Sequence, residues 1–198
     1  MEKNKSGRRW VPLPTTAQIQ QELDRLRLLK KYHHVLFSTV FSLVSAAAVV
    51  VLVCVLLMPV LRIYGSSMEP TLQDGNIVLC LKTSDFETGD LIGFYFNNKI
   101  LVKRVIASSG DWVYIDEAGN VSVNDVKLEE PYISDRSRGE CDLEFPYQVP
   151  DNRLFVMGDH RATSVDSRSN AVGCPSQEQV VGKIVFRVWP LNELNFLS

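Results

Sequence analysis

A long uncharged stretch near the start of the chain limits what this sequence can fold into. Residues 35–61 contain no Asp, Glu, Lys or Arg over 27 positions. About 20 apolar residues in a helix cross a bilayer, because each residue adds about 1.5 Å. The alternatives are a buried core helix, which is rarely so long without a charge, and a cleaved secretory signal. The sequence Leu56-Leu57-Met58-Pro59 offers no small-residue cleavage site. We therefore predict a retained transmembrane anchor over residues 35–61.

The charges on the two sides of this stretch predict its orientation. Residues 1–34 carry eight Lys or Arg and three Asp or Glu, so their net charge is +5, whereas the whole chain carries −2. Basic flanks stay in the cytoplasm. We therefore expect residues 1–34 to form a cytoplasmic, partly helical segment and residues 62–198 an extracytoplasmic domain. The expected location is the plasma membrane, with a single pass.

Residues 16–34 are predicted to be helical. Ile19, Leu23, Leu26 and Leu29 follow one another at steps of four, three and three, which places them on one helix face. Two interpretations stay open. The segment is either a solvated helix that continues into the anchor, or a basic amphipathic helix that lies on anionic lipid.

The rest of the sequence has the pattern of a mainly β domain. Short β-branched and aromatic runs alternate with turn signals such as Asp74-Gly75 and Asn124-Asp125. Such a pattern is typical of antiparallel strands. We predict an antiparallel β-sheet or barrel behind the one transmembrane helix, with residues 129–153 as a long surface excursion. The expected strands are residues 77–82, 91–96, 100–108, 112–116, 121–123, 126–128, 154–157 and 180–188.

The composition excludes several classes of function. A net charge of −2 argues against a chain that binds nucleic acid along its whole length. The four cysteines form no C-x-x-C pair, and only three histidines are present, so we expect neither a metal site nor a cofactor. Cys141 and Cys174 both fall in the predicted extracytoplasmic domain. Whether they form a disulfide stays open.

Three segments of this domain carry the residue types needed for nucleophilic catalysis. A serine hydroxyl is a weak acid and needs a base. The candidate bases are His160, the one histidine after the anchor, and Lys103. Strand alternation puts Lys103 on the same face as Leu101 and Val105, where burial would lower its pKa and let the neutral amine act as a base. The three segments are residues 63–72, 101–106 and 158–168.

Each segment also has a simpler explanation. Lys103 could be an edge-strand lysine whose ammonium group reaches water. Ser67 could be a turn serine before Pro70. Residues 158–168 could be a hydrogen-bonded loop without a catalytic role. Periodicity alone does not decide between these explanations and catalysis.

Taken together, the three segments closely resemble the signature motifs of the bacterial type I signal peptidases, membrane-bound Ser/Lys enzymes that process exported preproteins. The family motif Ser-Met-x-Pro-Ser/Thr-Leu stands here as residues 67–72. The lysine motif, an apolar residue followed by Lys-Arg and a second apolar residue, stands as residues 102–105, with Gly110-Asp111 beyond it. Residues 158–168 match Gly-Asp-Asn-x-x-x-Ser-x-Asp-Ser-Arg, with His160 in place of Asn. The motifs occur in the family's order behind one anchor.

The resemblance implies roles for individual residues. Ser67 corresponds to the nucleophile and Lys103 to the general base. Ser164 corresponds to a serine whose hydroxyl hydrogen-bonds the lysine and helps to aim it. Asp166 and Arg168 correspond to a pair that stabilises the loop around the site.

Two details of the implied site stay open. The Ser67 N–H would form part of an oxyanion hole. Gly65 stands where some members carry a serine that supplies a second donor, so the second donor in this chain is undetermined. His160 has three possible roles: a hydrogen-bonding substitute for Asn, an adventitious base, or a pH-sensitive element.

The resemblance also implies a substrate. Such enzymes cleave secretory preproteins after small residues at the first and third positions before the scissile bond (Ala-x-Ala). This preference needs two shallow apolar pockets beside an extended substrate strand. The expected partners are preproteins and the lipid bilayer, with no nucleic acid, and the protein is expected to be monomeric. The alternatives are a related Ser/Lys peptidase with a dedicated partner substrate and an inactive membrane-anchored binding protein. The residues expected to line the pockets are Leu61, Ile63, Leu72 and Val102.

Overall fold

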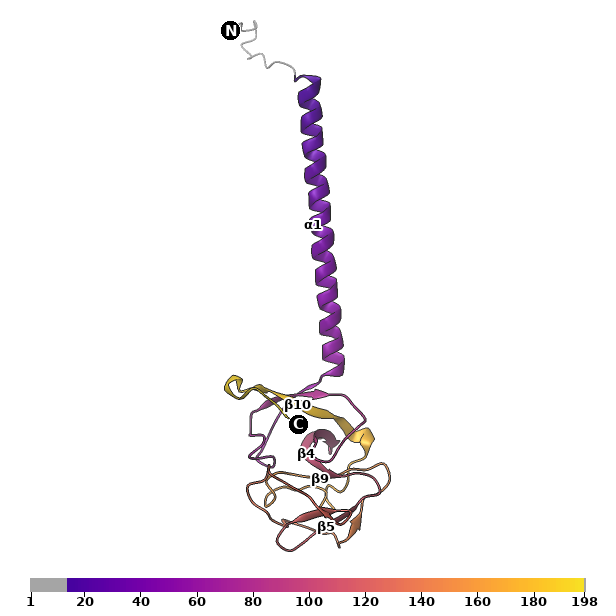
Figure 1. Ribbon diagram of the computed structural model, residues 1–198, viewed down its shortest axis with the longest axis vertical. Helices are drawn as coiled ribbons and strands as arrows, with labels where there is room; N and C mark the ends of the chain where they lie inside the picture. Colours follow the sequence, from indigo (N-terminus) through magenta and orange to yellow (C-terminus); the bar gives the residue numbers. More distant parts are fainter. Residues whose placement is uncertain (1–13, 198) are drawn as a thin grey trace. The chain divides into compact units, whose positions relative to one another are not determined.

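The computed structural model describes residues 14–197; the first part of the predicted basic segment, residues 1–13, lies outside them. Its first element is one uninterrupted helix of 42 residues, α1 (Thr16–Leu57) (Figure 1). By length and composition this helix can cross a membrane, and none of its residues is buried. It contains neither Gly nor Pro, where helices most often kink. Residues 16–34 therefore continue into the apolar part without a break, and both interpretations of this segment stay predictions.

The helix ends before the predicted apolar span does. Pro59 has no N–H to donate and disfavours the helical conformation of the residue before it. The chain leaves the helix after Leu57, and Val60–Arg62 form the first strand, β1. The last two residues of the predicted span 35–61 thus belong to a β-sheet.

The remaining elements are strands, joined by turns and two short 3₁₀ helices, η1 (Gln177–Gln179) and η2 (Leu191–Glu193). They form two sheets, in which every strand pair is antiparallel. The larger sheet has the order β1, β2 (Ile77–Leu81), β10 (Val180–Trp189), β3 (Leu91–Phe96), β4 (Lys99–Ala107) and β9 (Phe155–Met157), with β11 (Asn195–Phe196) paired to β10. The smaller sheet has the order β7 (Val126–Lys127), β6 (Val121–Val123), β5 (Trp112–Ile115) and β8 (Tyr147–Gln148).

The mainly β, antiparallel fold class is confirmed, in its sheet form and not as a closed barrel. Closure would need hydrogen bonds between the two outer strands of the larger sheet. These strands are β1 and β9, each three residues long, and they pair only with β2 and β4 within residues 14–197. The eight predicted strands are present with ends that differ by at most one residue. The strands β1, β8 and β11 were not predicted: β1 begins within the apolar run assigned to the anchor, β8 lies in the expected surface excursion, and β11 lies beyond the last predicted strand.

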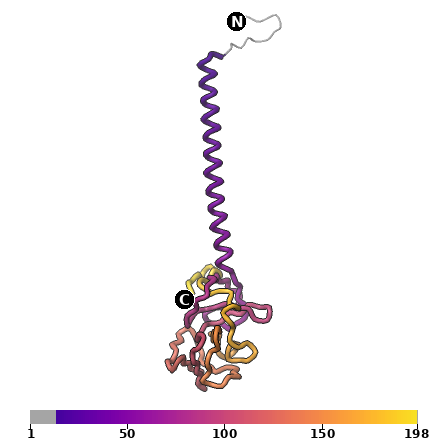
Figure 2. Tube along the Cα trace, turned by 90° about the vertical axis from the view of Figure 1, so that its right-hand side faces the viewer, coloured from indigo at the N-terminus to yellow at the C-terminus, as the bar shows by residue number. Residues whose placement is uncertain are grey.

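The order of the strands brings distant parts of the chain together. β10, drawn in yellow near the end of the sequence, lies between β2 and β3 (Figures 1 and 2). β4, next to the outer strand of the same sheet, pairs with β3 on one side and β9 on the other. This pairing places the segment around residue 103 beside the segment that follows residue 157.

Three apolar clusters fill the β domain. The first joins the two sheets, with members from β4, β5, β6 and β9 such as Ile106, Val113 and Phe155. The second lies under the segment that follows β1 and contains Ile63, Met68, Leu72, Val78, Cys80, Leu91 and Ile184. The third packs β3, β4 and β9 together, through Phe94, Val105 and Val156 among others. The second and third clusters hold the chain on either side of the predicted site.

Residues 129–153 differ in part from the predicted surface excursion. Most of the segment is exposed or half-buried, as expected. Glu130 and Val149, however, are buried, and Tyr147 belongs to the short strand β8. The burial of a glutamate has consequences for the site.

Candidate active site

Ser67 lies in a tight turn after β1 whose backbone is held at both ends. Ile63 N–H donates to the Asn76 carbonyl, and Gly75 N–H donates to the Ile63 carbonyl. Gly65 has a φ of +86°, which only glycine adopts without strain, and its N–H donates to the Asp74 carboxylate over 2.8 Å. Ser67 itself is half-buried at the end of this turn.

Lys103 lies in the middle of β4 and is 3% exposed. Its Nζ lies 2.8 Å from the Oγ of Ser67, so the structure brings these two predicted residues into direct contact. Burial lowers the pKa of Lys103 from its ordinary 10.5 to about 8; Asp166 opposes this effect, and the positive charge of Arg168 adds to it. A lysine with such a pKa is about one tenth neutral at pH 7.

The loop of residues 158–168 packs directly against the Ser67 turn. His160 N–H donates to the Ser67 carbonyl over 3.1 Å. Gly158 lies so close that an added Cβ would be 2.5 Å from the Ser67 carbonyl oxygen and 2.3 Å from the Ser164 Oγ. The loop therefore fits against the Ser67 turn only because residue 158 has no side chain.

Asp166 and Arg168 form the buried ion pair that the resemblance implies, with Nε 2.8 Å from Oδ1. Burial alone would raise the pKa of the Asp166 carboxyl. The hydrogen bonds and charge of Arg168, together with the Gly158 N–H, outweigh it and hold that pKa below its ordinary value. Arg168 also donates to the backbone carbonyls of Ser137, Arg138, Arg161 and Ser164. The guanidinium group thus ties the loop to residues outside it.

A second buried pair joins all three motif segments. Arg104, next to Lys103, donates to both carboxylate oxygens of Asp159 over 2.9 and 2.6 Å. The Thr71 hydroxyl donates to the same carboxylate over 2.6 Å. Bidentate pairs of this kind fix orientation as well as distance. The sequence placed these residues in the motifs but did not assign them a contact.

Ser164 differs from the expectation. Its Oγ is buried and has no hydrogen-bond partner among the described residues, so the implied hydrogen bond to Lys103 is not formed in this structure. The Nδ1 of His160 is likewise buried without a partner in the described part of the chain. The roles of both side chains stay predictions.

The predicted pocket residues lie along one groove and beneath it. A groove of about 730 Å³ separates β1 from the β3–β4 hairpin, and Leu61 and Val102 line it from opposite sides. Ile63 and Leu72 are buried in the second apolar cluster, against which Leu61 and Val102 pack. β1 is an outer strand of its sheet, so its backbone groups on this side are available to an added strand.

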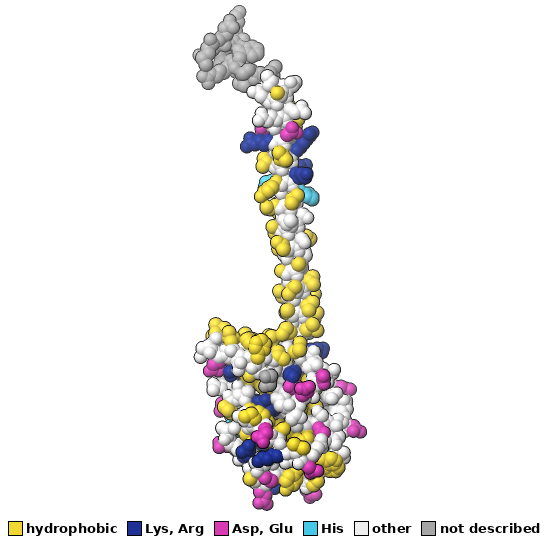
Figure 3. All heavy atoms as spheres, in the orientation of Figure 1, with side chains coloured by type: hydrophobic (Ala, Val, Ile, Leu, Met, Phe, Trp, Pro, Cys, Tyr) yellow, Lys and Arg dark blue, Asp and Glu magenta, His cyan; other side chains and the backbone are white. Residues whose placement is uncertain are grey.

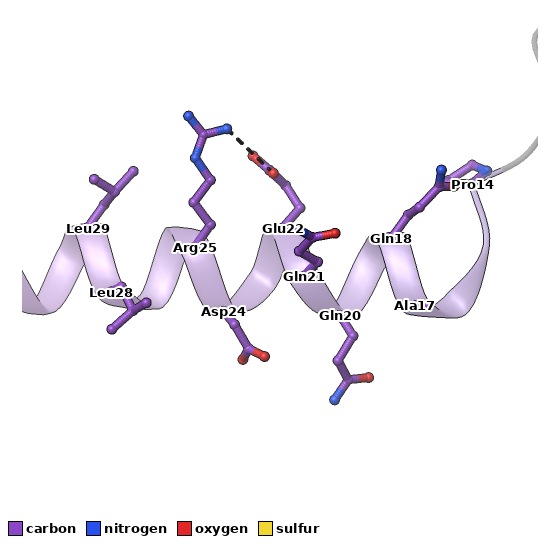
Figure 4. A pocket seen from close by; sticks show the side chains of 10 residues that line it. All are labelled: Pro14, Ala17, Gln18, Gln20, Gln21, Glu22, Asp24, Arg25, Leu28 and Leu29. Atoms are coloured by element: carbon purple, nitrogen blue, oxygen red, sulfur yellow. Dashed lines mark ion pairs between the residues drawn. The ribbon is translucent and has the colours of Figure 1, made fainter.

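Other parts of the described chain offer less. The hollow in Figure 4 is lined by residues 14–29, at and just before the start of α1, with an exposed ion pair between Arg25 and Glu22. All its walls come from one helical segment, so we assign it no site.

Residues 14–197 contain no group of three or more His, Cys, Asp or Glu placed to hold a metal ion. Cys141 and Cys174 are both free thiols.

The sequence-based prediction missed two buried residues, one within the loop of residues 158–168 and one in contact with it. Glu130 and Arg161 form an ion pair in which each side chain is at most 1% exposed. Arg161 belongs to the third motif, which was the one available signal. Glu130 follows Leu128 and Glu129 in a segment without a clear pattern, and nothing local marks it as buried.

Comparisons with known proteins show the family of the chain. A family model described as "Signal peptidase, peptidase S26" matches residues 36–189. Signal peptidase I U of Bacillus subtilis (strain 168) is 32% identical over 84% of this chain and 94% of its own length. Signal peptidase IB of Staphylococcus aureus (strain MRSA252) is 32% identical over 81% and 93%. A crystal structure of a signal peptidase I from Enterococcus faecalis V583 is 28% identical, with a TM-score of 0.41 over 50% of this chain and 96% of that one.

A serine endopeptidase is the class to which these matches assign the chain. The chain belongs to the signal peptidase family, peptidase S26. The resemblance to bacterial type I signal peptidases is thereby confirmed.

Proposed function

We propose that this protein removes signal peptides from exported preproteins, with Ser67 as nucleophile and Lys103 as general base. The single observation that carries the assignment of residues is the 2.8 Å contact between the hydroxyl of a half-buried serine and a buried lysine amine. Family membership supplies the reaction class. His160 is set aside as the base, because the geometry that supports catalysis involves Lys103.

The proposed reaction begins with Lys103 in its neutral form. Its Nζ takes the hydroxyl proton of Ser67 as Oγ attacks the scissile carbonyl carbon, and the Ser67 N–H stabilises the resulting oxyanion. The ammonium of Lys103 then gives the proton to the leaving amine, so the peptide C–N bond breaks and an acyl-enzyme remains. A water molecule, deprotonated by the same amine, hydrolyses the ester and restores both residues.

The supporting residues keep the dyad in place in this proposal. Asp166 and Arg168 brace the loop, and Ser164 is proposed to hydrogen-bond Lys103 when substrate is bound. Gly65 lets the chain turn sharply before the nucleophile. Because Gly65 has no hydroxyl, the second oxyanion donor comes from the backbone or from water.

The groove between β1 and β4 suits an extended substrate segment. A strand that enters it can pair with the free edge of β1, as in other cases of recognition by strand addition. Leu61 and Val102 would then face alternate substrate side chains above Ile63 and Leu72, so small residues fit and larger ones clash. We propose the Ala-x-Ala preference on this basis.

The membrane is the second proposed partner. Helix α1 supports an anchor over residues 35–57 of the predicted span 35–61, and the charge of residues 1–34 supports a cytoplasmic N-terminus and an extracytoplasmic domain over residues 62–198. The hairpin from β10 to β11 carries five exposed large apolar side chains, within an apolar area of the β domain that is visible in Figure 3. They are Val188, Trp189, Leu191, Leu194 and Phe196. Exposed apolar patches of this kind are typical of membrane or protein contacts. We also propose that this membrane is the plasma membrane and that the protein is monomeric.

The test uses purified full-length protein in detergent and a preprotein with an Ala-x-Ala site. Ser67→Ala and Lys103→Ala are compared with Ser134→Ala and Lys127→Ala, which alter exposed residues outside the site. We expect cleavage after the small residue by wild type and both controls, and none by the two site variants. Activity retained in Lys103→Ala would contradict the dyad and direct attention to His160. Folded wild-type protein that cleaves no preprotein would favour a dedicated substrate or an inactive scaffold.

A further inference from the structure

The carboxylate of Glu130 is buried behind the active-site loop. Glu130 is 4% exposed and pairs through both oxygens with the guanidinium of Arg161, whose Nη1 lies 3.2 Å from Oε2 and whose Nη2 contacts Oε1. Glu130 comes from the segment after β7, and Arg161 comes from the loop after β9. The pair therefore joins two segments that are not neighbours in either sheet.

Arg161 also makes hydrogen bonds within the loop of residues 158–168. Its Nε donates to the Gly158 carbonyl over 3.1 Å, and its own carbonyl accepts a hydrogen bond from Arg168 over 2.9 Å. Gly158 packs against the Ser67 carbonyl and Ser164, as its crowded Cβ position shows. A chain of direct contacts thus runs from Glu130 through Arg161 and Gly158 to Ser67.

The same segment contacts the other buried arginine of the site. The ring of Tyr132 stacks on Arg104, with 3.8 Å between the guanidinium carbon and the ring centroid. The Tyr132 hydroxyl donates to Glu130 over 3.3 Å. Residues 130–132 therefore support the arginine next to Lys103 as well as the loop next to Ser67.

The chemistry of the Glu130–Arg161 pair suits a role in orienting the loop better than a role in stabilising the fold. A buried ion pair is often no more stabilising than an apolar pair of the same size, because both charges lose their hydration. An apolar pair here would leave the buried Gly158 carbonyl without its donor. The guanidinium of Arg161 has enough N–H groups, in a fixed plane, to pair with the Glu130 carboxylate and to donate to the Gly158 carbonyl at the same time.

We propose that Glu130 is a positioning residue for catalysis: by holding Arg161, it fixes the Gly158 backbone against the Ser67 turn. Glu130 touches neither Ser67 nor substrate and acts only through Arg161. The inference rests on the proposed function, since it assigns Glu130 to the same Ser67 and Lys103 reaction.

The test compares Glu130→Gln with Glu129→Gln in full-length protein in detergent. Glu129 is the neighbouring residue and is exposed, so its variant controls for the loss of one acidic charge. Thermal midpoints are measured first, and kcat and KM are then measured well below them. We expect kcat of Glu130→Gln to fall by roughly 10- to 100-fold, because small displacements of reacting groups have effects of that order. KM should stay within about twofold, since the groove is untouched, and Glu129→Gln should match wild type.

A second variant separates positioning from folding. Arg161→Lys keeps a cation opposite Glu130 but loses the Nε–H that donates to Gly158. We expect its kcat to fall as in Glu130→Gln while its thermal midpoint stays closer to wild type. If Glu130→Gln does not fold, Arg161→Lys and Glu130→Asp decide the question.

Folded variants with wild-type kcat would overturn the proposal, and so would a loss confined to KM. Ser67→Ala, assayed in parallel, keeps the two proposals apart. If Ser67→Ala stays active, the proposed function fails. If Ser67→Ala is inactive while folded Glu130→Gln is fully active, only the role of Glu130 fails.

Discussion

Lys103 and Ser67 are 36 residues apart in the chain, and their Nζ and Oγ atoms lie 2.8 Å apart in the folded protein. The position of the lysine depends on β4, which is paired on both sides. The position of the serine depends on a turn anchored by the buried side chains of Met68 and Leu72. In the proposed reaction neither side chain needs to move far, so this geometry is preorganised.

The rate of cleavage should follow the deprotonation of Lys103. Burial lowers the pKa of its amine to about 8, so about one tenth of the free enzyme carries the neutral base at pH 7. We expect kcat/KM to rise about tenfold from pH 7 to a plateau above pH 9, measured with a peptide that does not titrate in this range. Lys103→Arg should be inactive at every pH, because a guanidinium stays protonated. A flat profile between pH 7 and 9 would contradict Lys103 as the base.

The same burial should make Lys103 a cost to stability. The folded pKa lies below the unfolded value of 10.5, so at pH 7 the folded protein holds a buried ammonium. Below pH 8 this cost to the free energy of unfolding is present in full. Between about pH 8 and 10.5 it shrinks, because Lys103 loses its proton in the folded state before it does so in the unfolded state, and above pH 10.5 it is absent. Lys103→Met should raise the free energy of unfolding by up to about 3 kcal/mol at pH 7 and by much less at pH 10. Thermal midpoints at the two pH values check this, and an equal gain at both would refute it.

Adding one methyl group at residue 158 should abolish activity. The new Cβ of Gly158→Ala would lie 2.5 Å from the Ser67 carbonyl oxygen, so the loop and the nucleophile turn must separate. We expect kcat/KM to fall by about 100-fold or more. Gly110→Ala is the control: its Cβ meets no atom within 4 Å, and its φ of +86° costs about 1–2 kcal/mol of backbone strain without moving the site. Similar activities for the two variants would show that the close approach is unimportant.

Enlarging the groove should relax the preference for small residues. Leu61 lines the groove and packs tightly over Gly93, where an added Cβ would lie 2.8 Å from its Cδ1. Leu61→Ala should therefore improve cleavage of peptides with Val in place of Ala at the third position before the scissile bond. The ratio of kcat/KM values for the two peptides should shift by about tenfold, as expected for one or two methyl groups in a pocket. Val126→Ala, at an exposed site on β7, should leave the ratio unchanged. If the ratio is also unchanged in Leu61→Ala, then Leu61 does not select the substrate.

Part of the site could be predicted because its signals are local. Ser67 and Lys103 lie within short motifs, and Lys103 has an alternation pattern that indicates burial. The contact between Arg104 and Asp159 could not be predicted, since it depends on how β4 and β9 pair. The burial of Glu130 could not be predicted either, because it comes from a segment whose own composition is that of an exposed loop.

Patterns within the chain were enough to predict the apolar helix, the mainly β character of the residues after 62, most of the strands and the family. These properties follow from hydrophobic periodicity, turn residues and short motifs, all of which act over a few residues. The open form of the larger sheet, the place of β10 between β2 and β3, and the groove between β1 and β4 could be seen only in the folded protein. The same is true of the buried pairs around Lys103. Strand order and the burial of a polar group depend on which distant segments come into contact. Whether a buried charge is stable depends on its loss of hydration and on the partner that it finds, and that partner is present only after the chain has folded.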